Sequence, residues 1–397
     1  MIDLGRTDRS VVGRWWWTVD RWTLLILLLT MAVGIVLIMA ASPAVAERIG
    51  LDSFHFVRRQ LLYLVPALIA LFGMSLLPVL WVRRIAVVGF ALSLVLLVGT
   101  LIGGESIKGA RRWIDFGGFL LQPSEFAKPT FAVFAAWMLS QRVTQPGFPG
   151  YALATAAAAI LVALLLMQPD VGMTLVVLCV WVTQMFLAGI PMFVVAVIAA
   201  VGAVGAVGAY ALFPHVAARI DRFLDPSSGD TFQIDASLNA FGNGGMFGTG
   251  PGEGIVKSIL PDAHADFIFA VAGEELGLFA SLAVVVLFAV LVLRGLVRLL
   301  RETDLFVVLA SSGILVQIGL QAVINMGVNV RLLPAKGMTL PFISYGGSSL
   351  LALAIGMGFV LALTRHRPGV AINSGLVAPA GVKPTSVGPA FSQGGAV

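Results

Sequence analysis

Residues 22–41 read WTLLILLLTMAVGIVLIMAA, a run of twenty residues without a charged side chain. A helix rises about 1.5 Å per residue, so this run is long enough to cross the roughly 30 Å hydrocarbon core of a bilayer. A polar leader, residues 1–21, precedes it, and it does not have the layout of a cleavable signal peptide. We therefore expect residues 22–41 to remain as a membrane-spanning helix.

The whole chain shares this character. Of its 397 residues, 59% are hydrophobic and only 11% are charged, whereas soluble domains carry roughly 25% charged residues. So few charged side chains cannot cover the surface of a soluble protein of this size, and most side chains must face lipid or one another. The composition predicts an all-α polytopic membrane protein that lies in the lipid bilayer. The net charge of +5 is explained by membrane topology, so we expect no nucleic-acid partner.

Hydropathy over a window of about 19 residues predicts about ten transmembrane helices. The fifth and sixth are separated only by Gln168-Pro169-Asp170, which we interpret as a tight turn because one helix of the combined length would be too long. The predicted spans are 22–41, 60–80, 85–102, 124–140, 151–167, 171–189, 191–213, 267–293, 305–326 and 344–364.

This pattern divides the chain into three parts. Residues 1–21 are a cytoplasmic N-terminal segment, and residues 22–366 are the ten-helix membrane domain. Within that domain, residues 214–266 form a large periplasmic loop between helices 7 and 8. Residues 367–397 are rich in Gly, Pro, Ala, Ser and Val, a composition that predicts a disordered cytoplasmic tail.

Arginine in the short connections sets the predicted orientation. Ten spans place both termini on one side, and that side holds Arg83-Arg84, Arg142 and the Arg294–Arg301 cluster, so the termini should be cytoplasmic. The opposite, periplasmic side nevertheless carries basic clusters at 108–112, 219–222 and 331–336. Two readings remain open: these clusters bind an anionic phosphate group, or they pair with acidic residues on the same face.

Three periplasmic segments place ionisable residues at membrane borders. In the first, Glu125 and Lys128 lie at i and i+3 within the fourth span. An ionisable side chain at that depth marks a site or has a buried partner, and the spacing also suits an ion pair within the helix. Another of these segments, residues 334–349, holds two prolines and paired glycines. They predict an irregular loop that dips to membrane level, with an ordinary connecting loop as the alternative.

Asp266 stands where the large loop meets the eighth span, close to His264. Asp is favoured at the N-cap of a helix, so Asp266 is either a cap, a catalytic base, or both. Glu274 follows two turns later on the same predicted helix. A carboxylate inside a span must find a partner in the protein interior or be protonated.

Seven motifs in these segments together resemble the SEDS family (shape, elongation, division, sporulation), whose members include FtsW, RodA and SpoVE. They follow the family order over roughly residues 20–365, and the stretch Lys336–Pro341 is similar to the FtsW, or cell-division, branch. The matching pieces are Arg112-Trp113-Ile114, Gln122-Pro123-Ser124-Glu125 with Lys128, Gln168-Pro169-Asp170-x-Gly172, Ala240-Phe241-Gly242-x-Gly244-Gly245, His264-x-Asp266-Phe267-Ile268-Phe269-Ala270, Glu274-Glu275-Leu276-Gly277, and Pro341-x-x-Ser344-Tyr345-Gly346-Gly347-Ser348-Ser349.

The resemblance implies a glycosyltransferase that polymerises lipid II into glycan strands at the outer face of the cell inner membrane, at the division septum. The family's essential loop carboxylate falls on Asp266, which becomes the catalytic candidate. The substrate-binding candidates are Arg112, Lys128, Glu125, Lys336, His264, Glu274 and Ser344. The implied partners are lipid II, the nascent glycan strand, a class B penicillin-binding transpeptidase of the FtsI type and other division proteins.

Several alternatives remain open from the sequence. No cofactor is certain and the metal requirement is unknown, although the chemistry is compatible with a divalent cation, Mg²⁺ or Mn²⁺. A ten-helix protein with ionisable residues inside its spans also fits a lipid II flippase. A RodA-like polymerase acting in elongation and a scaffold of the division machinery are the other candidates. The concentration of charged motifs on one face favours an enzyme acting on an exported substrate.

Overall fold

Each predicted span corresponds to one helix of the computed structural model, which describes residues 10–107, 110–115 and 117–365. The predictions for residues 1–9 and for the tail from residue 367 lie outside this described part. The ten helices are α2 (Arg21–Arg48), α3 (His55–Ser75), α4 (Val79–Gly103), α5 (Pro123–Thr144), α6 (Gly150–Met167), α7 (Val171–Leu187), α8 (Met192–Leu212), α12 (Ile268–Leu299), α13 (Leu305–Asn329) and α14 (Gly347–Leu363).

Length and apolar composition single out seven of these helices as able to cross a membrane: α2, α3, α4, α6, α8, α12 and α13. Helices α7 and α14 are apolar but shorter, and α5, with 22 residues, carries Glu125 and Lys128 within its first two turns. The protein is thus an all-α polytopic membrane protein, as predicted. The count of ten spans stays a prediction.

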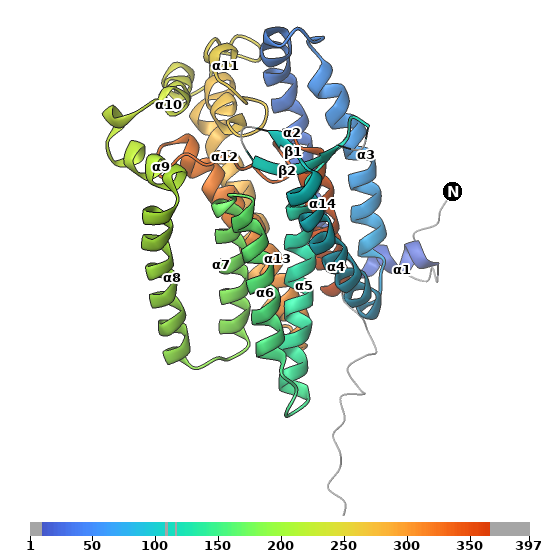
Figure 1. Cartoon of the computed structure of the whole chain (residues 1–397). Helices are drawn as coiled ribbons and strands as arrows, with labels where there is room; N and C mark the ends of the chain where they lie inside the picture. The colour runs from blue at the N-terminus through green and yellow to red at the C-terminus, as the bar shows by residue number, and fades with distance from the viewer. Residues whose placement is uncertain (1–9, 108–109, 116, 366–397) are drawn as a thin grey trace, which may run out of the picture. The chain divides into compact units, whose positions relative to one another are not determined.

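The centre of the bundle is formed by α5 and α13, whose residues are mostly buried. Helix α8 is different, because it stands apart from the bundle (Figure 1) and has no buried residue among those described. Its composition of Val, Ala and Gly is apolar on every side, which suits a helix surrounded by lipid. It contacts α7 and continues directly into α9 (Pro214–Leu224).

The turn between α6 and α7 lies where the sequence predicts it. Helix α6 ends at Met167 and α7 begins at Val171, so Gln168, Pro169 and Asp170 form the connection. Asp170 is the N-cap of α7, and its Oδ1 accepts a hydrogen bond of 3.2 Å from the amide of Met173. Asp is among the residues preferred at this position, because its carboxylate bonds an amide that has no partner within the helix.

The connection between α4 and α5 holds a small antiparallel sheet that hydropathy alone does not predict. Its strands are β1 (Glu105–Ile107), β2 (Ala110–Asp115) and β3 (Leu120–Leu121), in the order β1-β2-β3. Ile114 pairs with Leu121 in the register of β2 and β3. The strands are too short to give a period-two pattern that stands out beside the long apolar helices, but they fix Arg112 in an extended segment.

The segment between α8 and α12, which the sequence predicts to be a large periplasmic loop, is mostly helical; its periplasmic position stays a prediction. Besides α9 it contains a 3₁₀ turn, η1 (Pro226–Ser228), α10 (Phe232–Gly244) and the short α11 (Val256–Ile259). Helices α9, α10 and α11 lie with β1 and β2 toward one end of the bundle, and α1 (Val11–Thr18) lies toward the other (Figure 1).

Helix α12 is broken at Gly277, whose φ of 79° is in the left-handed region. A glycine suits this position because it adopts positive φ without a steric penalty. The glycine-rich loop, residues 242–257, fills the break. The amide of Thr249 donates to the carbonyl of Glu274 at 2.9 Å, and the amide of Leu278 donates to the carbonyl of Gly245 at 2.9 Å. The loop thereby satisfies backbone groups that the interrupted helix cannot.

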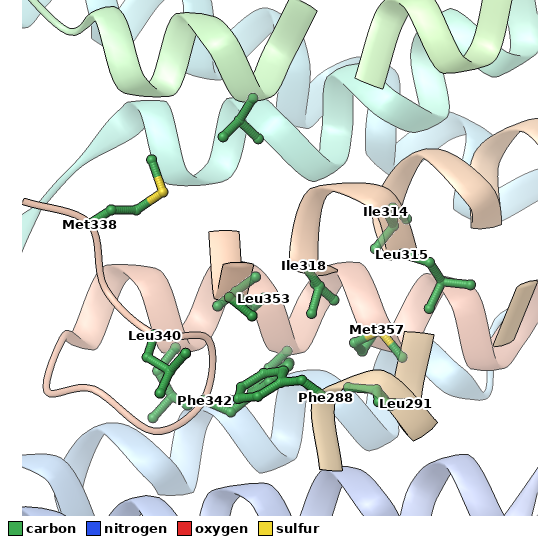
Figure 2. Close-up of a cluster of buried hydrophobic side chains, with 14 of the residues drawn as sticks. Phe288, Leu291, Ile314, Leu315, Ile318, Met338, Leu340, Phe342, Leu353 and Met357 are labelled. Carbon is green, nitrogen blue, oxygen red and sulfur yellow. The ribbon is translucent and has the colours of Figure 1, made fainter. Parts of the chain in front are cut away.

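Residues 330–346, called the buried loop, are irregular, as proline and glycine predict; their burial is concentrated in residues 338–344, and a position at membrane level stays a prediction. Met338, Leu340 and Phe342 are almost fully buried, and Figure 2 shows them in one hydrophobic cluster with residues such as Phe288 and Leu353 from the neighbouring helices. Removal of these apolar side chains from lipid and water into a packed core fixes the path of the loop. That path determines where Lys336 lies.

Ion pairs and a hydrogen bond join the ends of α2, α12 and α14 at the end of the bundle away from α9, α10 and α11. The carboxylate of Asp20, before α2, lies 3.2 Å from the guanidinium of Arg294 and 2.8 Å from that of Arg298, both on α12. Arg298 also donates to the carbonyl of Thr364 after α14 at 2.9 Å. The start of α2 and the end of α14 therefore both contact the end of α12; the cytoplasmic side of the termini stays a prediction.

Candidate active site

A cavity of about 200 Å³ lies where α9, α10, the start of α12 and the buried loop meet. It is lined by Arg219, Arg222, Gln233, Asp266, Phe267, Ala335, Lys336 and Gly337. Two of the candidates from the sequence, Asp266 and Lys336, are thus brought together although they come from segments on either side of α12 and α13. The cavity combines one carboxylate with three basic side chains.

The backbone leading to Asp266 is held at three consecutive carbonyl groups. The carbonyl of His264 accepts from the amide of Tyr345 at 2.9 Å, and that of Ala265 accepts from the hydroxyl of Ser344 at 2.5 Å. The carbonyl of Asp266 itself accepts from the side-chain amides of Asn325 at 2.8 Å and Asn329 at 3.1 Å. Fixed backbone of this kind orients the carboxylate for chemistry.

Asn325 also connects Asp266 to the opposite wall of the cavity. The same side-chain nitrogen donates to the carbonyl of Met338 at 2.6 Å, two residues after Lys336. Asn329, one turn further along α13, accepts from the amide of Ala270 at 3.1 Å through its side-chain oxygen. Helix α13 therefore sets the spacing between the two segments that carry Asp266 and Lys336.

The interpretation of Asp266 as an N-cap is wrong. Helix α12 begins at Ile268 with Phe267 in the capping position and no side-chain cap hydrogen bond. The two asparagines of α13 hold this end of the helix instead, so the Asp266 side chain is directed to the cavity that it lines.

Lys336 and Arg112 share one buried carboxylate, that of Asp170. The ammonium of Lys336 lies 2.7 Å from Oδ1 of Asp170, and Nε of Arg112 lies 3.6 Å from Oδ2. Arg112 is fixed further by hydrogen bonds to the carbonyls of Gln168 at 3.1 Å and Pro169 at 2.6 Å. The turn before α7 thus positions Lys336, which lines the cavity, and Arg112, which is not among the lining residues.

Charge and burial shift the pKa values in this cluster. Burial raises the pKa of Asp170, but attraction to Lys336 and Arg112 and its hydrogen bonds outweigh that effect, so the pKa lies below its ordinary 3.8. Burial lowers the pKa of Lys336 below its ordinary 10.5, and Asp170 opposes part of this decrease. Asp170 is therefore ionised at neutral pH and stabilises the positive charge beside it.

Two glycines allow the close approach of these groups. A Cβ atom at position 172 would overlap the side-chain carbons of Lys336, and one at position 337 would lie 2.6 Å from Oδ2 of Asp266. Neither site tolerates a larger residue without displacement of a cavity side chain. The motif glycine Gly172 thus has a packing role that its sequence context does not reveal.

Lys128 and Glu125 form the ion pair that their spacing predicts. Their charged atoms are 2.9 Å apart and both side chains are 2% exposed. Lys128 also contacts the sulfur of Met173 on α7 at 3.2 Å. Neither residue is among those lining the cavity, so their part in substrate binding stays a prediction.

Glu274 is fully buried and holds the glycine-rich loop. Its carboxylate accepts hydrogen bonds from the amides of Ile255 at 2.8 Å, Val256 at 2.7 Å and Lys257 at 3.1 Å. Its neighbour Glu275 pairs with the ammonium of Lys257. This geometry gives Glu274 a structural role at the start of α11, and its predicted contact with substrate stays a prediction.

His264 and Ser344 support the loop around Asp266. The His264 ring stacks on Phe56 with ring centres 4.1 Å apart and also contacts Tyr345. The Ser344 hydroxyl joins the carbonyl of Ala265 to the amide of Leu340, from which it accepts at 2.8 Å. Both residues support the backbone that leads to Asp266, but neither lines the cavity.

The sequence did not identify several residues that the geometry brings to the site. Asp170 was assigned to a turn, and Asn325 and Asn329 were not assigned a role. For Asn325 and Asn329, the usable signal in the sequence is a polar side chain near the end of an apolar helix, because a buried side-chain amide must find hydrogen-bond partners. Arg219 and Arg222 belong to a basic cluster for which the sequence leaves phosphate binding and ion pairing open, and the structure places both side chains at the cavity.

The fold and the site define a polytopic helical membrane protein with an Asp-containing, basic cavity at one end of its bundle. The family model for cell cycle proteins that groups FtsW, RodA and SpoVE matches residues 20–368. The chain belongs to this family, which confirms the resemblance.

Curated relatives extend over most of the chain. A probable peptidoglycan glycosyltransferase FtsW of Caulobacter vibrioides is 43% identical, with 93% of this chain and 95% of that protein aligned. A protein of the same description from Geobacter metallireducens is 38% identical, over 88% of this chain and 96% of that protein.

Solved structures show the same fold. A chain of a peptidoglycan synthase complex, described as coordinating polymerization and crosslinking, aligns with a TM-score of 0.72 and 28% identity, over 87% of this chain and 97% of that chain. The rod shape determining protein RodA of Thermus thermophilus aligns with a TM-score of 0.63 and 28% identity, over 88% of this chain and 97% of that chain.

Proposed function

We propose that this protein is a peptidoglycan glycosyltransferase that polymerises lipid II at the outer face of the inner membrane. The observation that carries the proposal is the convergence of Asp266 with Lys336, Arg219 and Arg222 in one cavity. Glycosyl transfer from a lipid pyrophosphate needs a base for the acceptor hydroxyl and positive charge for the leaving group. The names of the curated relatives support the same activity.

Asp266 acts as the base in this mechanism. Its carboxylate takes the proton from the sugar 4-hydroxyl of the acceptor lipid II, and the oxygen attacks the anomeric carbon of the lipid-linked glycan chain. The bond from that carbon to the pyrophosphate oxygen breaks with inversion of configuration. The hydrogen bonds at three successive carbonyls limit the movement of Asp266, which favours a near-attack geometry.

Lys336 and Arg112 stabilise the departing undecaprenyl pyrophosphate. Both already share the carboxylate of Asp170, so they are pre-arranged, and little reorganisation is needed when negative charge develops. Two cations against one carboxylate leave a net positive charge beside the cavity. Lys128 supports this region indirectly, through its contact with Met173 on α7.

A divalent cation, Mg²⁺ or Mn²⁺, belongs to the proposal only as a companion of the substrate. The described residues hold no group of three His, Cys, Asp or Glu side chains that could form a metal site. Within the cavity, the Asp266 carboxylate and the Gln233 amide are the oxygen donors of the described side chains. Mg²⁺ often binds through one carboxylate together with substrate phosphates, but no step of the mechanism above depends on it.

The proposal includes a place and partners. The arginines in the short connections support cytoplasmic termini and a cavity at the periplasmic face. The likeness to a chain of a peptidoglycan synthase complex supports a class B transpeptidase of the FtsI type as a partner, together with other division proteins. The FtsW names of the relatives support action at the division septum.

The test is a polymerisation assay with the purified full chain and lipid II, with and without the cognate transpeptidase. We expect glycan strands in at least one of these two conditions. Failure in both, accompanied by transbilayer movement of fluorescent lipid II in proteoliposomes, would favour a flippase. Depletion of the protein in its host distinguishes the two polymerase roles. Cells that lose a division enzyme grow into filaments, whereas cells that lose an elongation enzyme become round.

A further inference from the structure

We propose that Arg219 and Arg222 of α9, together with Arg331, bind the pyrophosphate of a second lipid-linked substrate, the acceptor, while Lys336 and Arg112 serve the donor. The inference rests on the proposed function, because polymerisation brings two lipid pyrophosphates together and releases only one. The structure contains two groups of cations whose electrostatic surroundings differ.

The first observation concerns counter-ions. Lys336 and Arg112 are paired with the carboxylate of Asp170, whereas the hydrogen bonds of Arg222 go to backbone carbonyls. Arg222 is held by the backbone carbonyls of Ala218 at 2.8 Å and Asp230 at 3.4 Å. Backbone contacts orient its guanidinium without neutralising it, so it stays available to an anion.

The second observation is the position of these arginines. Arg219 and Arg222 line the cavity that contains Asp266, and they also line an adjoining smaller hollow to which Arg331 contributes. Lys336 lines only the first space and Arg331 only the second. Four basic side chains therefore face two adjoining spaces, against the two carboxylates of Asp266 and Asp230.

The third observation is the cost of this arrangement without a ligand. Burial lowers the pKa of Arg219 and the neighbouring charge of Arg112 lowers it further, while Asp170 and Asp266 oppose part of this decrease. Arg331 has a φ of 55°, a left-handed conformation that is uncommon for a residue with a side chain. Half-buried like charges and a strained backbone are unfavourable in the free protein, and a dianionic pyrophosphate relieves the electrostatic part of that cost.

The geometry of α9 fits this role. Arg219 and Arg222 are three residues apart, so they lie on the same face of the helix. Helix α9 follows α8 after a single residue, Phe213, and α8 is exposed along its length. A lipid whose chain lies along α8 has its headgroup at the level of α9, next to both arginines. The bound acceptor then presents its sugar hydroxyl toward Asp266.

The test counts bound lipids by native mass spectrometry on the full chain with its transpeptidase. The probe is lipid II with a shortened prenyl chain, and Asp266→Asn is the parent because it should bind substrate without turnover. We expect the parent to bind two lipids. Adding Arg219→Gln and Arg222→Gln should lower the two-lipid population at least tenfold and leave the one-lipid state, and Arg222→Lys should restore part of the second site.

Arg58→Gln is the matched control, because Arg58 is an exposed arginine paired with Asp52 at the start of α3; it should bind two lipids like the parent. Two bound lipids in the arginine variant, or a single bound lipid in the parent at saturation, would overturn the second site. Failure of the proposed polymerase activity gives a different result. The parent then binds two lipids in an arginine-dependent manner, but the wild-type complex makes no glycan strands.

Discussion

The ammonium of Lys336 lies 2.7 Å from Oδ1 of Asp170, although the two residues are 166 positions apart in the sequence. Asp170 also faces Arg112 and caps α7. One carboxylate thus connects the strand segment after α4, the turn before α7 and the buried loop after α13. The position of the cations beside the cavity depends on this connection.

Asp170→Asn should weaken both the fold and the activity. Removal of one partner from a buried ion pair leaves uncompensated charge, which costs about 3 kcal/mol, and Lys336 loses its anchor. We expect a lower Tm in detergent and a fall in polymerisation of at least tenfold. Asp221→Asn is a suitable control because Asp221 is bonded to Tyr210 at an exposed site; a loss of the same size there would contradict the account.

The same carboxylate predicts a pH dependence of stability. The pKa of Asp170 in the folded protein lies below 3.8, so the stability that it contributes is fully present above that pH and is lost as the pH falls through the folded value. The difference in Tm between wild type and Asp170→Asn should therefore be largest near neutral pH and shrink in acid. A difference that grows on acidification would have the wrong sign.

Gly172→Ala should reduce activity by displacement of Lys336. The added methyl group overlaps the Lys336 side chain, so the ammonium must leave Asp170 and the donor KM should rise. Gly73→Ala on α3 adds the same methyl group where nothing lies within 4 Å. That control should be neutral or stabilising by up to about 1 kcal/mol. Equal activity of the two variants in the polymerisation assay would refute the packing argument.

Asn325→Ala should lower kcat more than it raises KM. The substitution removes the hydrogen bonds to the carbonyls of Asp266 and Met338, so the base is less well oriented while the cationic side chains remain. A loss on the order of tenfold or more is expected from misplacement of a catalytic group. Val323→Ala, at an exposed position of the same helix, is the control and should retain both constants.

Glu274→Gln should loosen the glycine-rich loop. The neutral amide offers one oxygen in place of the two that accept from three backbone amides, at a local cost of about 1–3 kcal/mol. Faster hydrogen exchange at residues 245–257 is the expected readout. Glu253→Gln changes an exposed carboxylate in the same segment, and unchanged exchange in Glu274→Gln relative to this control would show that the loop does not depend on Glu274.

The sequence predicted the features that depend on local composition. The apolar helices, the turn at Gln168–Asp170 and the irregular loop after α13 each follow from hydropathy or from proline and glycine. The Glu125–Lys128 pair was also predictable, because helix geometry fixes the distance between residues i and i+3. Family resemblance identified Asp266 and Lys336 but not how they are held.

The remaining features depend on contacts between distant segments. The pairing of Lys336 with Asp170 and the hydrogen bonds of Asn325 arise only once α7, α12 and α13 are packed. A carboxylate within a predicted span indicates a catalytic residue and a structural residue equally well, and Glu274 is such a case. Its partners are backbone amides, which the side-chain sequence does not reveal. The cap assigned to Asp266 failed because tertiary hydrogen bonds from α13 replaced a local one.

The central claim is that Asp266 is the base of a glycan polymerase, and one measurement addresses it most directly. Lipid II polymerisation is followed with the purified Asp266→Asn chain and its transpeptidase, alongside wild type, with folding checked by Tm. The account predicts that the variant folds and binds lipid II but forms no glycan strands. Strand formation by Asp266→Asn at the wild-type rate would contradict it.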